Sequence, residues 1–429
     1  MPWVLLAAGV LLALMTVPAA YAVHHWTLLF PAFVVSWLGT GMAGWWMAIV
    51  FAGTAALVAL GALSAWPGWL GLALVVVSMA VLLRQARLAR KGAAEFDRVL
   101  AERVAPRSTT PRSRRSMVLP WLMHDREVER IKNVRYADGA GRRHLLDVYR
   151  PRAVPPTGAP VLLQIHGGGW TIGTKGTQGR PLMNRLARAG WVCVAANYRL
   201  SPRGRWPDHL VDAKLALAWI RGHIAEHGGD PTRVVVTGGS AGGHLTAMMA
   251  LTQNDPRYQP GFEHADTSVT AAIPMYGAYD LAEIFGRFES SIGGRIGGWM
   301  GSLMMGVTPA DDLDAYVDAS PIAHVTDAAP PFLVVHGTID NLVPVEQARR
   351  FVAALREAGA DVTYVELVGA PHAFDVFHSA WEHASTTGIE WWLSSVVPVT
   401  AGGATGTSRS VVGATGAIDP TTMARTAPS

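Results

Sequence analysis

The fold is decided by the stretch Thr237-Gly-Gly-Ser-Ala-Gly-Gly-His244, which joins a strand-like run to a helix-like run through a tight turn. The preceding residues Arg233-Val-Val-Val-Thr237 are typical of a buried strand, and a helical pattern begins near Ala241. Glycines two residues before and after Ser240 let the two backbone segments approach closely. Ser240 is therefore expected on a strained turn with its hydroxyl exposed. A glycine-rich turn with an incidental serine has the same pattern, so the interpretation depends on other motifs.

The region around this motif, from about residue 127 to residue 397, alternates between short β-rich runs and helix-like runs. Such alternation predicts an α/β fold with a mostly parallel sheet and helices on both faces. The expected strands are 161–165, 192–196, 234–237, 271–275, 332–335 and 362–367, and the expected helices are 181–189, 208–226, 242–252, 345–358 and 380–393.

A second glycine motif, His166-Gly-Gly-Gly-Trp170, directly follows the expected strand 161–165. Such a loop can direct backbone N–H groups at a negatively charged oxygen that forms during acyl transfer. We expect the amides of Gly168, Gly169 and Ala241 to be the donors, and His166 to orient the loop. A phosphate-binding loop is the alternative, but the Lys-Ser/Thr pair of a P-loop is not found here.

Two late loops contain a candidate acid and a candidate base, Asp340 and His372, each just beyond an expected strand. The carboxyl ends of parallel strands form the ligand crevice of an α/β sheet. The order Ser240, Asp340, His372 is the order of a nucleophile, acid and base on such a sheet. A turn aspartate and a surface histidine are the simpler interpretations of each residue alone. Asp375 and His378 are the nearest substitutes.

These motifs, together with Asn197-Tyr-Arg-Leu-Ser-Pro202 and Gly228-Gly-Asp-Pro231, resemble the hormone-sensitive-lipase-like and carboxylesterase branches of the α/β hydrolases. The resemblance covers about residues 134–393 and implies a serine esterase that needs no metal or organic cofactor. It implies Ser240, Asp340 and His372 as the catalytic triad and an acyl-enzyme on the serine.

With its tryptophan after the three glycines, this motif also resembles that of kynurenine formamidases and feruloyl-esterase-like members. An aryl formamide or amide hydrolase with the same triad is therefore an open alternative. A catalytically silent hydrolase fold that serves as a binding module is a second one.

The first 90 residues are expected to be an α-helical transmembrane region with three or four spans. The apolar runs are 3–23, 45–63 and 69–83, and the shorter run 26–37 leaves the count open. A cleaved signal peptide ending near Ala20-Tyr-Ala22 is the alternative for the first run, although a basic start is missing.

Basic residues follow this region closely: ten Lys and Arg residues lie between Arg84 and Arg115, in a chain of formal net charge +4. Residues 91–126 are expected to form a basic juxtamembrane linker. Segments rich in Lys and Arg beside a membrane span remain in the cytoplasm. The multi-pass protein should therefore have its catalytic domain, residues 127–397, on the cytoplasmic side. The sequence contains no nucleic-acid-binding motif. The expected partners are the membrane and a small or lipid-like ester, with no obligate protein partner.

Three further segments complete the expected organisation. Residues 278–318 form an apolar, glycine-rich insertion, interpreted as a cap over the acyl pocket, as ordinary core packing or as a contact with the bilayer. Residues 398–429 are expected to be a disordered tail because they are rich in Gly, Ala, Thr and Ser. The single cysteine, Cys193, lies in an apolar strand-like run and is expected to be buried and inert.

Overall fold

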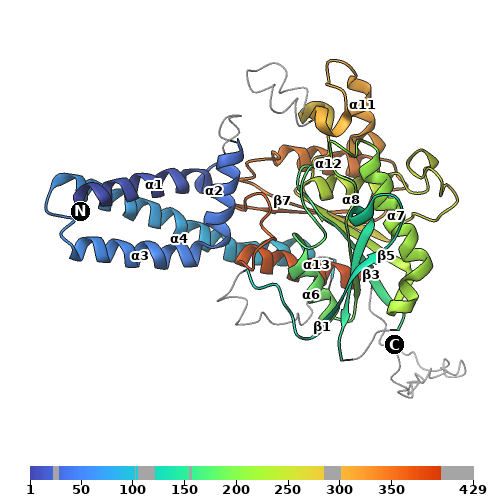
Figure 1. The fold of residues 1–429 in the computed structure, drawn as a ribbon, viewed down its shortest axis with the longest axis horizontal. Helices are drawn as coiled ribbons and strands as arrows, with labels where there is room; N and C mark the ends of the chain where they lie inside the picture. The colour runs from blue at the N-terminus through green and yellow to red at the C-terminus, as the bar shows by residue number, and fades with distance from the viewer. Residues whose placement is uncertain (23–28, 102, 105–120, 154–156, 285–300, 398–429) are drawn as a thin grey trace, which may run out of the picture.

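The computed structural model describes residues 1–22, 29–101, 103–104, 121–153, 157–284 and 301–397 (Figure 1). The expected tail and residues 102 and 105–120 of the expected juxtamembrane linker lie outside these residues. So do Phe285, Phe288, Trp299 and Met300 of the expected cap.

An eight-stranded sheet forms the centre of the larger part of the molecule, in the order β1-β2-β4-β3-β5-β6-β7-β8. β1 and β2 pair antiparallel at one edge, and β3 to β8 run parallel. The strands are β1 Val128–Arg135, β2 Leu145–Pro151, β3 Ala159–Ile165, β4 Val192–Ala196, β5 Gly229–Gly239, β6 Ala271–Met275, β7 Phe332–Gly337 and β8 Val362–Leu367.

Helices cover both faces of this sheet, as the alternating pattern predicted. Val161, Leu163 and Ile165 of β3 pack with α7, α8 and α12, whereas Leu162 packs with α6 and α13 on the other face. Burial on both faces is the reason why these strands are almost continuously apolar. The helices are α6 Arg180–Arg188, α7 Asp208–His223, α8 Ala241–Leu251, α11 Leu313–Asp318, α12 Glu346–Glu357 and α13 Ala380–Val396.

The α/β fold is confirmed, and the six expected strands correspond to β3 to β8. The sequence interpretation missed β1 and β2. β1 reads Val-Glu-Arg-Ile-Lys-Asn-Val-Arg and is mostly half-buried or exposed, so it lacks the apolar run that identifies the central strands. Its place at the sheet edge is the physical reason.

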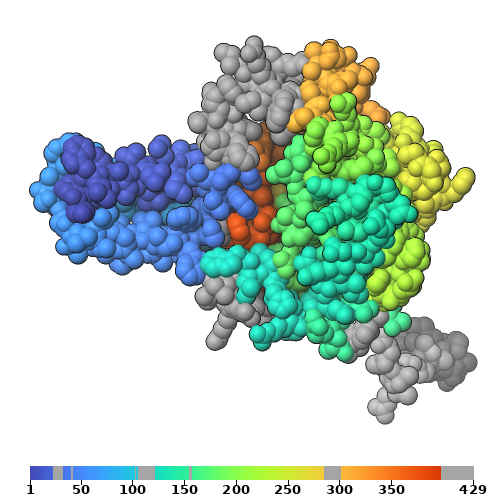
Figure 2. Space-filling view, viewed as in Figure 1, coloured from blue at the N-terminus to red at the C-terminus, as the bar shows by residue number. Residues whose placement is uncertain are grey.

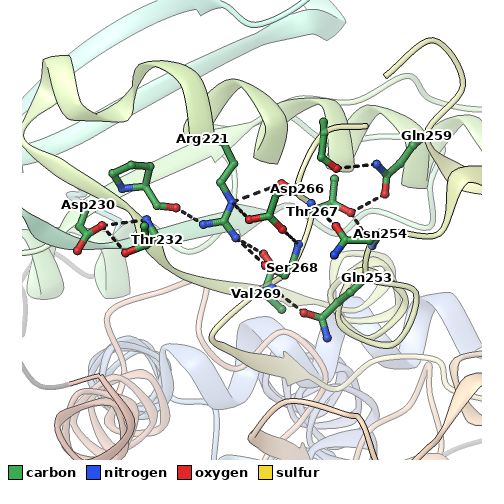
Figure 3. A network of polar contacts seen from close by, with 12 residues as sticks. Arg221, Asp230, Thr232, Gln253, Asn254, Gln259, Asp266, Thr267, Ser268 and Val269 are labelled. Atoms are coloured by element: carbon green, nitrogen blue, oxygen red, sulfur yellow. Dashed lines mark hydrogen bonds and ion pairs between the residues drawn. The ribbon is translucent and has the colours of Figure 1, made fainter. Parts of the chain in front are cut away.

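The connection between α8 and β6 is held by a network of polar contacts (Figure 3). Arg221 of α7 donates to the carbonyl of Ser268 at 2.6 Å and pairs with Asp266 at 3.1 Å. Asn254 and Thr267 exchange two hydrogen bonds, at 3.0 and 2.8 Å. These contacts fix the chain where it enters β6, the strand beside the Ser240 turn.

The N-terminal helices project from the hydrolase-like part as an arm (Figures 1 and 2). α1 Pro2–Ala20, α3 Ala43–Ala59 and α4 Trp66–Leu100 lie side by side, and α2 Leu29–Gly41 crosses them at the end nearest the sheet. Among the described residues, α1 and α4 are long and apolar enough to cross a membrane. The bent pair 32–39 and 43–59 is a third candidate, so the expected three or four spans stay a prediction.

α4 corrects the expected boundary of the linker, because residues 91–100 continue this helix instead of leaving it. Phe96 and Leu100 are buried there in one core with α13, and Gly92 lies against the ring of Trp381. The apolar spacing of Ala89, Phe96 and Leu100 places them on one helix face, which explains why the helix continues. The arm is therefore joined to the larger part through a continuous helix.

The described part of the expected cap packs on the main core. Met304 is fully buried in the core that contains α7 and α8, and its carbonyl accepts a hydrogen bond from the Trp206 amide at 2.8 Å. This residue acts as core packing, whereas the assignment of 278–318 as a cap stays a prediction.

Candidate active site

Ser240 lies between the end of β5 and the first residue of α8, on the tight turn that its sequence motif predicted. Its φ of 60° and ψ of −124° are rare for a residue with a side chain. Such strain persists only where the surrounding structure imposes it, and it is concentrated at functional sites. The Ser240 amide donates to the carbonyl of Met275 at 3.0 Å, which ties the turn to the end of β6.

The glycines around Ser240 are required by close backbone contacts. A Cβ on Gly238 would lie 2.5 Å from the carbonyl oxygens of both Ile165 and Gly242. A Cβ on Gly242 would collide with the same Ile165 carbonyl. The turn therefore packs against the end of β3, where the second glycine motif begins.

Asp340 and His372 come together in a buried pair at the ends of β7 and β8. The Nδ1 atom of His372 lies 2.7 Å from Oδ2 of Asp340, and the two side chains are at most 3% exposed. The other carboxylate oxygen accepts the backbone amides of Leu342 and Val343, each at 2.8 Å. This geometry holds Nε2 as the free end of the His372 ring for proton transfer.

Electrostatics keep Asp340 ionised. Burial alone would raise its pKa, but the charge of His372 and hydrogen bonds from His336 and His372 lower the pKa well below the usual value. An ionised acid at this place stabilises the imidazolium that forms when the base accepts a proton.

Tyr276 lies between the serine turn and the histidine. Its ring centroid is 4.8 Å from that of His372, in an edge-to-face arrangement. The same ring packs against Gly239, where any Cβ would collide with the Tyr276 hydroxyl. The structure thus brings Ser240, Asp340 and His372 to one site at the carboxyl ends of the strands.

The glycine loop after β3 lies beside the serine. A Cβ on Gly167 would be 3.1 Å from Cβ of Ser240, so this loop borders Ser240 directly. Gly168 and Gly169 have φ values of 116° and 57°, which side-chain-bearing residues rarely adopt. Within the described part of the chain, no acceptor is found for the backbone N–H groups of Gly168, Gly169 or Ala241. The assignment of these three amides as oxyanion donors stays a prediction.

His166 has the structural surroundings expected of an orienting residue. It is buried, stacks on Tyr198 at 4.4 Å, and contacts the Gly167 carbonyl through Nδ1 at 2.7 Å. Burial lowers its pKa to about 4. A buried, neutral imidazole with these contacts fits the expected orienting role.

Two supporting residues, His244 and Gln178, were missed in the sequence. His244, four residues after Ser240, accepts from the indole N–H of Trp170 at 3.3 Å and contacts the Ala319 carbonyl at 2.8 Å. Gln178 accepts the Gly167 amide at 2.5 Å and donates to Tyr276 at 3.3 Å. The sequence offered one signal for His244: Trp170 ends one glycine motif and His244 ends the other.

The two substitutes for the acid and base have other partners. Asp375 accepts a hydrogen bond from Tyr276, and burial raises its pKa to about 6. His378 contacts Glu382 at 3.2 Å in a surface depression. Neither replaces Asp340 or His372 in the pair that the structure forms.

The remaining candidates from the sequence are the single cysteine and possible metal ligands. Cys193 is fully buried in β4, and burial raises the pKa of its thiol. Among the described residues, no group of three or more His, Cys, Asp or Glu side chains is placed to hold a metal ion.

A cavity of about 170 Å³ lies beside the segment that follows the glycine loop. Its wall includes Gln178, the residue that holds the Gly167 amide, together with the apolar side chains of Trp121, Val376 and Phe377. Trp121 in turn contacts Trp45 of α3, with ring centroids 5.9 Å apart. The cavity therefore shares Gln178 with the glycine loop and Trp121 with the N-terminal helices.

Comparison with known proteins agrees with this architecture. A family model described as BD-FAE matches residues 146–355. The probable carboxylic ester hydrolase LipM of Mycobacterium tuberculosis is 48% identical over 258 residues, which are 60% of this chain and 59% of LipM. The match thus spans less than two thirds of that relative's length.

Two other proteins extend the similarity. Esterase LipC of Mycobacterium tuberculosis is 40% identical over 310 residues, which are 72% of this chain and 74% of LipC. The solved structure of a thermophilic esterase from Thermogutta terrifontis, Est2, is 28% identical and covers 67% of this chain and 98% of its own, with a TM-score of 0.52. On the strength of the match to LipC, the chain belongs to the esterases of the α/β-hydrolase superfamily.

Proposed function

We propose that this protein is a membrane-anchored serine esterase that cleaves carboxylic esters through an acyl-enzyme on Ser240. The observation that carries the proposal is the buried His372–Asp340 pair, at 2.7 Å, beside a serine on a strained turn. Membership of the esterase family supports the same reaction.

The reaction begins when Oγ of Ser240 attacks the ester carbonyl carbon and its proton passes to Nε2 of His372. The carbonyl oxygen becomes an oxyanion, which the amides of Gly168, Gly169 and Ala241 stabilise. The C–O bond to the alcohol then breaks, and the leaving oxygen takes the proton from His372. Water, deprotonated by His372, attacks the acyl-enzyme and releases the acid and free Ser240.

A lipid-like ester fits the surroundings of the site. The cavity beside Gln178 has Trp121, Val376 and Phe377 in its wall, and Trp121 contacts Trp45 of the N-terminal arm. Large apolar side chains remain exposed along this arm, as expected for surfaces in contact with lipid tails. An ester whose acyl or alcohol group is anchored in a bilayer would reach the site from this side.

The arrangement of helices supports three spans, formed by α1, α3 and α4. The N-terminus lies at the end of the arm far from the sheet (Figure 1). With the basic residues after Arg84 on the inner side, the catalytic domain faces the cytoplasm and the N-terminus lies outside. A C-terminal fluorescent protein should be bright, and a C-terminal alkaline phosphatase inactive. The reverse result would contradict the orientation.

The reaction is tested with detergent-solubilised protein and p-nitrophenyl esters of increasing acyl length. Wild type should hydrolyse them, and Ser240→Ala should lose at least about 10³-fold in kcat. Ser395→Ala, an exposed serine on α13, is the matched control and should keep full activity.

A fluorophosphonate probe should label wild type and Ser395→Ala but not Ser240→Ala. Equal turnover by wild type and Ser240→Ala would refute the esterase proposal and favour a silent binding module. Turnover of aryl formamides alone would favour the formamide hydrolase.

A further inference from the structure

The N-terminal arm contacts both loops that carry the acid and the base of the site. At the end of α1, the carbonyl of Pro18 accepts a hydrogen bond at 3.3 Å from Asn341, the residue after Asp340. On α4, Leu88 and Gln85 lie against Gly369, three residues before His372. Gln85 also donates to the carbonyl of Ala19, which ties α4 to the end of α1.

The shortest helix of the arm, α2, contacts the catalytic histidine itself. The ring of Phe33 lies edge-to-face with the imidazole of His372, with centroids 5.6 Å apart. Together with Tyr276, Phe33 surrounds the imidazole, and His372 is only 3% exposed. An aromatic contact of this kind restricts how the imidazole can tilt toward Ser240.

Trp37, one helical turn after Phe33, holds the next residue of the same loop. Its indole N–H donates to the carbonyl of Ala373 at 3.1 Å, and its ring stacks on Phe377 at 4.7 Å. Ala373 has a φ of 57°, in the left-handed region that a side chain disfavours. The hydrogen bond therefore stabilises a strained backbone directly after the base.

We propose that α2 is a positioning element of the active site, and that Phe33 and Trp37 hold His372 in its productive orientation. The proposal rests on the proposed function, since it concerns the same base. It assigns to the membrane arm a role in catalysis beyond anchoring.

The position of α2 suits this role. It crosses the other helices at the junction, where the N-terminal arm in blue meets the C-terminal segment in red (Figure 2). Trp37 and Ala373 are 336 residues apart in sequence, so only the docking of the arm brings them together. Because the arm is apolar, this docking also places the His372 loop beside the membrane surface.

The test compares five variants of the full-length protein in detergent: Phe33→Ala, Phe33→Tyr, Trp37→Phe, Ser240→Ala and Phe51→Ala. Phe33→Tyr keeps the aromatic contact, and Trp37→Phe keeps a ring for stacking but removes the N–H donor. Phe51 is the matched control, because it is a phenylalanine on α3 that is 71% exposed.

Turnover of p-nitrophenyl acetate is measured per active site, with sites counted by fluorophosphonate titration. Counting sites separates slower catalysis from loss of folded protein. Phe33→Ala should lower kcat about threefold to tenfold, as expected for loss of one aromatic contact, with KM changed less than about twofold. Trp37→Phe should also lower kcat, whereas Phe33→Tyr should restore it and Phe51→Ala should match wild type.

The inference is overturned if Phe33→Ala and Trp37→Phe turn over each titrated site as fast as Phe51→Ala does. It is also overturned if both variants raise KM and leave kcat unchanged. Should Phe33→Ala fail to fold, Trp37→Phe alone decides between these outcomes. Activity in Ser240→Ala would instead refute the proposed function, so the two failures are distinguishable.

Discussion

The Nε2 atom of His336 lies 3.2 Å from Oδ2 of Asp340, the same oxygen that Nδ1 of His372 contacts. His336 also contacts the carbonyl of Val343 through this atom at 3.0 Å. A second imidazole thus supports the acid of the proposed triad from inside the protein. The arrangement resists movement of the carboxylate when His372 becomes charged.

Replacing His336 by Leu should destabilise the protein and lower kcat, because Asp340 loses a hydrogen-bond partner. Loss of a hydrogen bond to a charged group typically costs about 1.5–3 kcal/mol of unfolding free energy. Thermal unfolding measures the first effect, and kcat per titrated site measures the second. His336→Gln retains a donor and should lie closer to wild type. Equal stability and kcat in His336→Leu would show that the contact has no energetic role.

Asp340→Asn should reduce kcat by about 10⁴-fold, because an amide at this position cannot stabilise the imidazolium. The variant should also change how stability depends on pH. Since the folded pKa of Asp340 lies below the unfolded value, its carboxylate stabilises the fold above about pH 4, and this stabilisation is lost as pH falls further. The difference in unfolding free energy between wild type and variant should therefore be larger at pH 7 than at pH 3. A pH-independent difference would contradict this assignment.

Asp375 should have the opposite pH dependence. Burial raises its pKa to about 6 in the folded protein, from 3.8. The protonated carboxyl therefore stabilises the folded protein. This stabilisation is fully present below about pH 4 and is lost as pH rises through about 6. This difference between the folded and unfolded pKa corresponds to about 3 kcal/mol of unfolding free energy. Asp375→Asn should gain stability relative to wild type between pH 4 and pH 8, as measured by chemical unfolding. A constant difference over this range would exclude the effect.

Trp170→Phe removes the indole N–H that His244 accepts at 3.3 Å. A buried acceptor without a donor costs about 1–3 kcal/mol, and the glycine loop loses a contact with α8. We expect lower thermal stability and a lower kcat on p-nitrophenyl acetate. Trp219→Phe, which changes a partly buried tryptophan on α7, is the control. If both variants behave alike, the Trp170–His244 contact does not support the loop.

Local patterns in the sequence determined the parallel sheet, the strained serine turn and the glycine loop. Each depends on residues adjacent in the chain: an apolar strand buried on both faces, followed by glycines whose missing Cβ allows close backbone contact. The order of Ser240, Asp340 and His372 could be read because each follows a strand end. β1 was missed because it is an edge strand, mostly half-buried or exposed, and lacks that apolar pattern.

Only the tertiary structure decided how these parts meet. The 2.7 Å contact that selects Asp340 over Asp375, and the support from His336 and His244, depend on loops and helices packed at specific distances. The same holds for the arm, which by composition was simply an apolar anchor. Its contact with His372 joins residues 339 positions apart. Apolar periodicity shows that a helix is buried or lies in lipid, whereas the identity of its neighbours is set by packing.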